Sequence, residues 1–222
     1  MKLIVAADAG AAASRAAQWI ALGLQHDVAA RGTALLALSG GRTPLLMLRE
    51  LARAALPWES IRVAQVDERI VAADDERRNA RALHSALVEH GPLSAPHLLA
   101  MPVQAADLAV AAAEYALQLS TIDIVQLGLG EDGHTASLVP GDPLLAETAA
   151  RVGISIDYQG TRRMTLTFAA INSARRIAWL VTGESKRARL AELLAGAGSS
   201  PAGQVRRDGA VVFADEAAAA PA

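Results

Sequence analysis

A histidine and two carboxylates lie within four residues of one another on a glycine-rich segment that runs from Gly128 to Gly141. A histidine beside a carboxylate is typical of groups that transfer protons near neutral pH. Within this segment His134 is preceded by Glu131 and Asp132. We therefore predict that His134 is catalytic, and that Asp132 or Glu131 orients its ring or stabilises its charged form.

The same segment contains the pattern G-x-G-x-x-G, formed by Gly128, Gly130 and Gly133. That pattern is typical of dinucleotide-binding proteins, whose glycines let the backbone approach a pyrophosphate. Here it comes late in the chain, and Glu131 and Asp132 would oppose a pyrophosphate with like charge. We therefore expect Gly130 and Gly133 to contact a substrate instead, and we predict no cofactor.

A second candidate site consists of Ser39, Gly40, Gly41 and Arg42, between a buried apolar run and an expected helix. The free N–H groups at a helix N-terminus and the positive end of the helix dipole favour an anion. Arg42 adds a full positive charge to this position. We expect these four residues to contact a phosphate or a sugar, although an ordinary strand-to-helix turn has a similar composition.

Three further segments place charged side chains beside expected strands. Asp67 and Arg69 follow one such strand, Lys186 follows another, and Arg163 precedes a third. Arginine is suited to a bidentate contact with phosphate, whereas lysine acts as a point charge. We treat all four as candidates for substrate or phosphate binding, with a solvated surface charge as the alternative for each.

The composition excludes several other kinds of chemistry. The chain has no cysteine, so disulfides, thiolate metal sites and thiol nucleophiles are excluded. No cluster of histidines and carboxylates has the spacing of metal ligands, and no serine lies in a G-x-S-x-G pattern. The formal net charge of -2 gives no reason to expect a polyanion-binding face. We therefore predict no metal and no nucleic-acid partner.

The elements that position these loops alternate between strands and helices. Several apolar runs are continuous, which is typical of strands buried on both faces. We expect strands over residues 3–7, 33–38, 61–66, 98–102, 122–127, 151–156, 164–168, 177–182 and 210–213. We expect helices over residues 8–30, 43–55, 79–89, 106–119 and 183–194, with Asp8 and Thr43 as caps of the first two. This alternation predicts an α/β fold with a mainly parallel sheet and helices on both faces.

At 222 residues the chain is long enough for one well-buried domain over residues 1–222, and we expect the alanine-rich residues 216–222 to form a flexible tail. No stretch approaches the roughly 18 apolar residues of a membrane span. Asp8 interrupts the first apolar run too early for a signal peptide. We expect a cytoplasmic protein without a membrane partner, as a monomer or a small homo-oligomer.

Taken in order, these segments resemble the 6-phosphogluconolactonase family, whose members hydrolyse 6-phospho-D-glucono-1,5-lactone in the pentose phosphate pathway. The resemblance is carried by residues 39–44, 67–69, 128–141, 163–167, 183–186 and 211–215. The chain departs from the family at Arg78-Asn79, where members often have serine before asparagine. It also departs at Tyr158-Gln159-Gly160-Thr161, where members often have proline before the Arg-x-Thr-Leu-Thr segment.

The resemblance implies a Rossmann-like α/β fold, no nucleotide or metal cofactor, and a small-molecule sugar-phosphate lactone as substrate. It implies that His134 acts near the lactone carbonyl and that Arg69 and Lys186 lie near the phosphate. On this basis we hypothesise that neutral His134 activates the attacking water and that Asp132 supports the imidazole.

Two other functions compete with this hypothesis. Glucosamine-6-phosphate deaminase shares the fold, but it has a glutamate where this chain has Val139 and a tyrosine where this chain has Arg69. The lactonase is therefore preferred to a deaminase or a sugar-phosphate isomerase. A non-catalytic sugar-phosphate sensor is the third hypothesis, and neither a helix-turn-helix extension nor a basic patch supports it.

Overall fold

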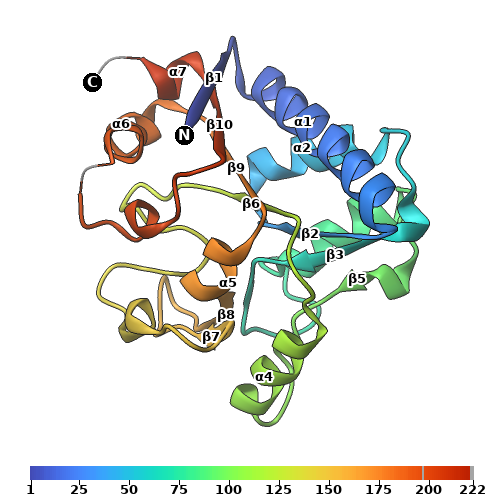
Figure 1. Cartoon of the computed structure of the whole chain (residues 1–222). Coiled ribbons are helices and arrows are strands. Elements are labelled where there is room, and N and C mark those ends of the chain that lie inside the picture. Colours follow the sequence, from blue (N-terminus) through green and yellow to red (C-terminus); the bar gives the residue numbers. More distant parts are fainter. Residues whose placement is uncertain (197, 221–222) are drawn as a thin grey trace.

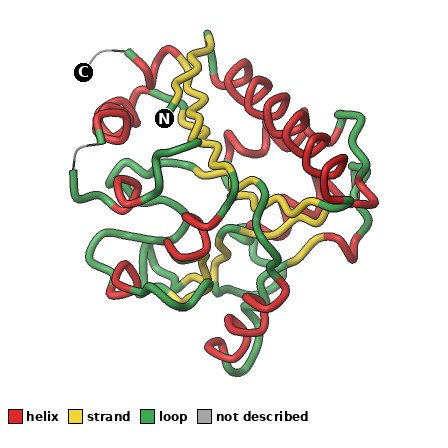
Figure 2. Tube along the Cα trace, in the orientation of Figure 1, coloured by secondary structure: helices red, strands yellow, loops and turns green. Residues whose placement is uncertain are grey.

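A parallel sheet of seven strands forms the centre of the computed structural model, which describes residues 1–196 and 198–220 (Figures 1 and 2). Its strand order is β1-β10-β9-β6-β2-β3-β5. The strands are β1 Lys2–Ala6, β2 Ala34–Leu38, β3 Ile61–Gln65, β5 Leu98–Leu99, β6 Ile124–Leu127, β9 Arg176–Val181 and β10 Ala210–Asp215. The predicted mainly parallel sheet is confirmed.

Helices cover both faces of this sheet, as the sequence predicted (Figure 1). In β2, Leu35 and Ala37 pack into one core, whereas Ala34, Leu36 and Leu38 pack into the other. Both faces need apolar side chains, which is why β2 is a continuous apolar run. One face is covered by α1 Ala9–Arg31, α2 Arg42–Ala52 and α3 Asn79–Leu83, and the other by α4 Leu108–Gln118, α5 Phe168–Ser173, α6 Arg187–Ala195 and α7 Glu216–Ala219.

A second, antiparallel sheet of three strands lies apart from the first in the order β4-β8-β7. It consists of β4 Asp67–Arg69, β8 Arg163–Leu166 and β7 Val152–Ile154. The strands expected over residues 151–156 and 164–168 do form, but they do not join the parallel sheet: β8 pairs with β4, and β7 pairs with β8. Their buried apolar pattern suits either sheet, so it could not indicate the partner.

The caps of the first two helices differ in how well they were predicted. Asp8 caps α1 as expected, because its side chain accepts a hydrogen bond from the first turn. Thr43 is not the cap of α2, which begins one residue earlier, at Arg42, after Gly41. The Thr43 hydroxyl lies instead 2.8 Å from that of Thr182. The φ of 118° at Gly41 is a conformation that favours glycine, so this turn replaces a side-chain cap.

The helix expected over residues 79–89 has two parts. Asn79–Leu83 is the α-helix α3, and His84–Glu89 continues it as a π-helix. Such π-helical insertions are rare and cannot be recognised from an apolar period of 3.6 residues. None of the described helices is both long enough and apolar enough to cross a membrane.

The C-terminal residues differ from the flexible tail expected over 216–222. Glu216–Ala219 form α7, whose start is capped by Asp215 through a 2.9 Å hydrogen bond from the backbone N–H of Ala218. Ala218 is buried against the core. Alanine is a strong helix former, so an alanine-rich composition is compatible with a docked helix as well as with a tail. Residues 221 and 222 lie outside the described part of the chain.

Candidate active site

The loops that follow four neighbouring strands meet at one edge of the parallel sheet. The strands β3, β2, β6 and β9 are adjacent in this order, and their carboxyl ends lead towards Asp67, Ser39, Gly128 and Thr182. The strands β3 and β6 lie on opposite sides of β2. Open α/β sheets bind ligands at such a switch point, because the loops on its two sides diverge and leave a crevice.

A cavity of about 180 Å³ lies at this edge and brings most of the predicted residues together. Those that line it are Ser39, Gly40, Asp67, Arg69, Gly130, His134, Arg163 and Lys186. An adjoining cavity of about 660 Å³ shares Gly40 and Lys186 with the first. The adjoining cavity is also lined by Gly41, Arg42 and Glu131, so the N-terminus of α2 faces the same region.

His134 is held by a carboxylate and a phenol. Its Nδ1 lies 2.6 Å from Asp132 Oδ1, and its backbone N–H donates to the same oxygen at 3.1 Å. The Tyr158 hydroxyl donates to Asp132 Oδ2 at 2.9 Å and lies 3.3 Å from His134 Nδ1. An ionised carboxylate only accepts hydrogen bonds, so Nδ1 carries the imidazole proton and Nε2 keeps its lone pair. His134 can therefore act as a base through Nε2.

The protonation states of its neighbours support this tautomer. Burial raises the pKa of Asp132, but hydrogen bonds from His134 and Tyr158 outweigh burial and hold that pKa below its usual value. Burial and the hydrogen bond to Asp132 raise the pKa of Tyr158 to about 12. At neutral pH Asp132 is therefore an anion, and Tyr158 is a neutral donor.

Glu131 does not contact the histidine, which resolves the choice between the two carboxylates in favour of Asp132. Glu131 Oε1 lies 3.6 Å from Lys186 Nζ. A hydrogen bond from Ser185 and the charge of Lys186 lower the pKa of the Glu131 carboxyl. Glu131 therefore pairs with the lysine at the rim of the adjoining cavity.

Two glycines of the His134 loop are required by close packing. A Cβ at Gly130 would overlap the ring of His134 and would lie 2.6 Å from Asp132 Oδ1. Gly133 has a φ of 85°, and a Cβ there would lie 2.6 Å from Ser200 Cβ. Gly133 was predicted to contact the substrate, but it lines neither cavity. Its positive φ and its packing against Ser200 explain why a glycine stands there. The glycine pattern thus shapes the loop around the histidine and its carboxylate.

The two arginines of the cavity wall come from the antiparallel sheet. Arg163, on β8, is 6% exposed, and burial lowers the pKa of its guanidinium. Its Cζ lies 5.0 Å from the centre of the Tyr158 ring. Arg69, on β4, donates to the carbonyl of Arg77. Asp67, the buried anion of this wall, accepts a 2.6 Å hydrogen bond from the Ser137 hydroxyl.

Two residues of this region were missed or set aside in the sequence. Asn79 lines the cavity and donates to the Asp67 carbonyl at 3.0 Å, and a Cβ at Gly40 would overlap it. It stands in one of the segments that depart from the family pattern, which made its contribution doubtful. Tyr158 stands in the other departing segment, on the loop between β7 and β8. A single tyrosine in a loop has no motif, so its contact with His134 could not be found from the sequence.

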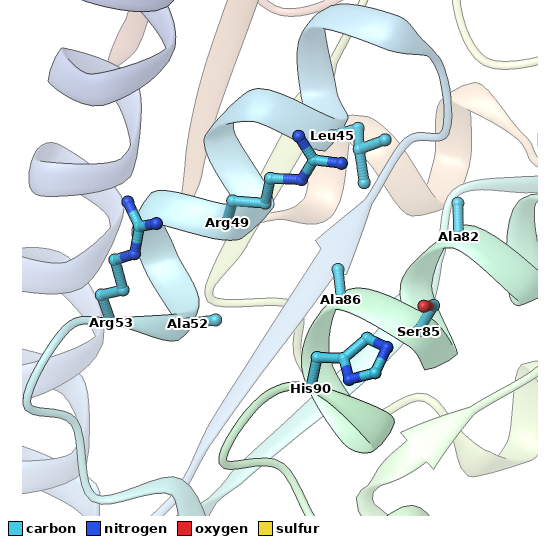
Figure 3. Close-up of a pocket in the computed structure, with 8 residues that line it drawn as sticks. All are labelled: Leu45, Arg49, Ala52, Arg53, Ala82, Ser85, Ala86 and His90. Atoms are coloured by element: carbon cyan, nitrogen blue, oxygen red, sulfur yellow. The ribbon is translucent and has the colours of Figure 1, made fainter.

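A third cavity, of about 310 Å³, lies between α2 and the π-helix and is separate from this site (Figure 3). It shares no lining residue with the other two cavities. Its side chains include Arg49, Arg53 and His90, and none of its described lining residues is a carboxylate. Its histidine, His90, has Nε2 3.9 Å from Oε2 of Glu89, which does not line the cavity. Over residues 1–196 and 198–220, no three His, Asp or Glu side chains are grouped so as to hold a metal ion.

Comparison with known proteins gives the same family from sequence and from structure. The family model described as glucosamine-6-phosphate isomerases/6-phosphogluconolactonase matches residues 7–213. The chain is 38% identical to the 6-phosphogluconolactonase of Synechocystis over 179 residues, which is 76% of this chain and 74% of that protein. It is 36% identical to the enzyme of the same name from Rhizobium meliloti, covering 76% of this chain and 77% of that one.

A solved structure indicates the same family as the sequence comparisons. The crystal structure of a 6-phosphogluconolactonase from Shewanella baltica superposes with a TM-score of 0.85 at 28% identity, covering 97% of each chain. The residues matched by the family model include every strand of the parallel sheet except β1, in whole or in part, together with the loops that line both cavities at its edge. The chain therefore belongs to the glucosamine-6-phosphate isomerase/6-phosphogluconolactonase family.

Proposed function

We propose that this chain is a 6-phosphogluconolactonase, which hydrolyses 6-phospho-D-glucono-1,5-lactone to 6-phosphogluconate in the oxidative pentose phosphate pathway. Its relatives of that name support the activity. The observation that carries the proposal for the site is the pairing of His134 with Asp132 in a cavity that Arg69, Arg163 and Lys186 also line. A base and a group of cations are what a phosphorylated ester substrate requires.

In the proposed reaction, neutral His134 removes a proton from water through Nε2 while the water oxygen attacks C1 of the lactone. The carbonyl electron pair moves onto its oxygen, which backbone N–H groups of the glycine loops stabilise. Asp132 stabilises the imidazolium that forms. The tetrahedral intermediate then breaks its bond to the ring oxygen, which receives the proton from Nε2. The product is an open-chain carboxylic acid, which ionises and releases one proton to the solvent.

The phosphate, remote from C1, is proposed to supply the binding energy that positions the lactone. Lys186 lines both cavities, and Arg42 lies at the N-terminus of α2. A helix N-terminus beside an arginine and a lysine favours a doubly charged group. The binding energy of the phosphate is used to hold C1 near Nε2 of His134. The attack on C1 then takes place between groups that are already positioned and oriented. Hydrolysis by this route needs no cofactor, and we place it in the reducing cytoplasm, with which a cysteine-free chain is compatible.

The deaminase alternative is weakened by the surroundings of the histidine. Val139, which stands where the deaminase has its glutamate, is 1% exposed and carries no charge. The carboxylate that contacts His134 comes instead from Asp132, two residues before it. That partner supports proton transfer to and from water, so this observation favours the lactonase.

One assay tests the activity. Freshly prepared phosphogluconolactone is added to the protein in a pH-stat, and alkali uptake is compared with the spontaneous rate. We expect uptake well above that rate, with one proton released for each lactone opened. Glucosamine 6-phosphate is tested in parallel for ammonia release. Uptake equal to the spontaneous rate would contradict the lactonase, and ammonia release would favour the deaminase.

A further inference from the structure

Tyr158 connects the two halves of the candidate site, the histidine pair and the arginine wall. Its hydroxyl donates to Asp132 Oδ2 at 2.9 Å, and its ring lies edge-on to that of His134, with the ring centres 5.3 Å apart. The guanidinium of Arg163 lies over the same ring, 5.0 Å from its centre. We propose that Tyr158 is a positioning residue for the lactonase reaction, acting through Asp132 and Arg163. This inference rests on the proposed function.

The hydroxyl fixes the carboxylate that supports His134. Asp132 Oδ1 is occupied by His134, and Oδ2 is occupied by Tyr158. A carboxylate bound at both oxygens cannot rotate without losing a hydrogen bond. The Asp132 side chain is 36% exposed, so without the Tyr158 hydroxyl water would compete for Oδ2. The hydroxyl also withdraws negative charge from the carboxylate and so limits how strongly Asp132 stabilises the imidazolium.

The ring and the backbone of Tyr158 hold Arg163. Besides lying over the ring, Arg163 donates through Nη2 to the Tyr158 carbonyl at 3.4 Å and to Gln159 Oε1 at 3.5 Å. A guanidinium over an aromatic face is attracted by the negative face of the ring, most strongly where water is excluded. Arg163 is buried, so this attraction helps to keep its charge at the cavity wall.

A tight turn presents Tyr158 to the site. The backbone N–H of Tyr158 donates to the Thr161 carbonyl at 3.1 Å. Between them Gln159 has a φ of 55° and Gly160 a φ of 80°. A non-glycine residue with positive φ is uncommon, and such conformations cluster at functional sites. This turn belongs to the segment Tyr158-Gln159-Gly160-Thr161, which departs from the family pattern.

The groups that could influence the titration of His134 come from several elements. Those that touch it or share its cavity are Asp132, Tyr158, Asp67, Arg69, Arg163 and Lys186. Replacement of Tyr158 by phenylalanine removes one hydroxyl and leaves every charge in this set in place. A change in the pH profile of that variant therefore reports on the loss of the hydroxyl, which donates to Asp132 and lies 3.3 Å from His134 Nδ1, and the same variant without the Asp132 carboxylate separates these two contacts.

The experiment compares Tyr158→Phe and Tyr158→Leu with the wild-type chain in the lactone assay. For Tyr158→Phe we expect kcat to fall about 10-fold, because the base is less well positioned. The acid limb of kcat/KM should move up by about 0.5 pH unit, because a carboxylate without the hydroxyl stabilises the imidazolium more strongly. KM should stay near the wild-type value, because the ring remains under Arg163. Tyr158→Leu should in addition raise KM by about 3- to 10-fold.

Two further variants make the test specific. Tyr115 is the only other tyrosine of the chain, and its buried hydroxyl bonds to Gln65 and Leu99 away from His134. Tyr115→Phe should lower the melting temperature and leave the acid limb unchanged. In an Asp132→Ala background, Tyr158→Phe should no longer move the acid limb, because the group through which it acts is gone.

The outcomes separate this inference from the proposed function. Wild-type kcat and an unmoved acid limb in folded Tyr158→Phe would overturn the positioning role. So would an equal shift of the limb in the Asp132→Ala background. A wild-type chain that does not accelerate lactone hydrolysis would instead contradict the proposed function, whatever the variants do.

Discussion

Arg69 and Arg163 occupy directly opposed positions in the register of β4 and β8, and both line the cavity that contains His134. Two like charges opposite each other on an antiparallel pair destabilise it. Burial lowers the pKa of the Arg163 guanidinium, and the charge of Arg69 lowers it further, while the Asp67 anion opposes these effects. The pair therefore favours an anion bound between or beside the two side chains.

This arrangement predicts that a phosphorylated product stabilises the protein. At 100 times its dissociation constant, 6-phosphogluconate should add about 2.7 kcal/mol to the free energy of unfolding. For a chain of this size that corresponds to a rise in melting temperature of roughly 5–10 °C. Gluconate, which lacks the phosphate, serves as the control in thermal denaturation. An equal rise with gluconate would contradict a role of the phosphate.

Replacement of His134 by alanine should reduce kcat by roughly 10²–10⁴-fold, because the proton acceptor is lost. His26 offers a matched control, because its Nδ1 also lies beside an aspartate, 3.5 Å from Asp27 Oδ1. Unlike His134, its side chain is 75% exposed and lines none of the three cavities described above. His26→Ala should retain wild-type turnover in the same pH-stat assay. Full activity of His134→Ala would remove this histidine from the mechanism.

Replacement of Lys186 by alanine should raise KM by about 10-fold or more, because a charge-assisted hydrogen bond to the phosphate is lost. The effect on kcat should be smaller, since Lys186 is not proposed to take part in proton transfer. Lys2 is the only other lysine and lies at the start of β1, so Lys2→Ala is the control for loss of one positive charge. Steady-state kinetics that give an unchanged KM for Lys186→Ala would argue against a phosphate contact.

Replacement of Gly130 by alanine should impair catalysis by displacing His134. The added methyl group would overlap the imidazole and crowd Asp132 Oδ1, so the ring must move from its present position. Because the imidazole would no longer be aligned with the substrate, kcat should fall about 10²-fold, even in a folded protein. Gly10→Ala, whose Cβ would meet only Asp8 at 3.3 Å, is the control. Comparable kcat values for the two variants would show that the close packing at Gly130 is not needed.

Much of the fold was determined by the sequence itself, because the strands of the parallel sheet are short and mainly apolar runs. Once these strands are parallel, their carboxyl ends must share one edge. That is why Ser39, Arg69, His134 and Lys186 were expected near one another and do line one cavity. The Asp132–His134 pair was also predictable, because its members are two residues apart on a loop that glycines shape.

The tertiary structure alone decided the partners that lie far apart in the chain. Ser137 contacts Asp67 across 70 residues, and Tyr158 contacts Asp132 across 26. The antiparallel sheet, in which Arg69 and Arg163 stand opposite each other, was not predicted. A strand of three or four residues has too few positions to specify which strand it pairs with. Local patterns record how each element buries its own side chains, whereas the pairing of distant elements depends on how all of them pack together.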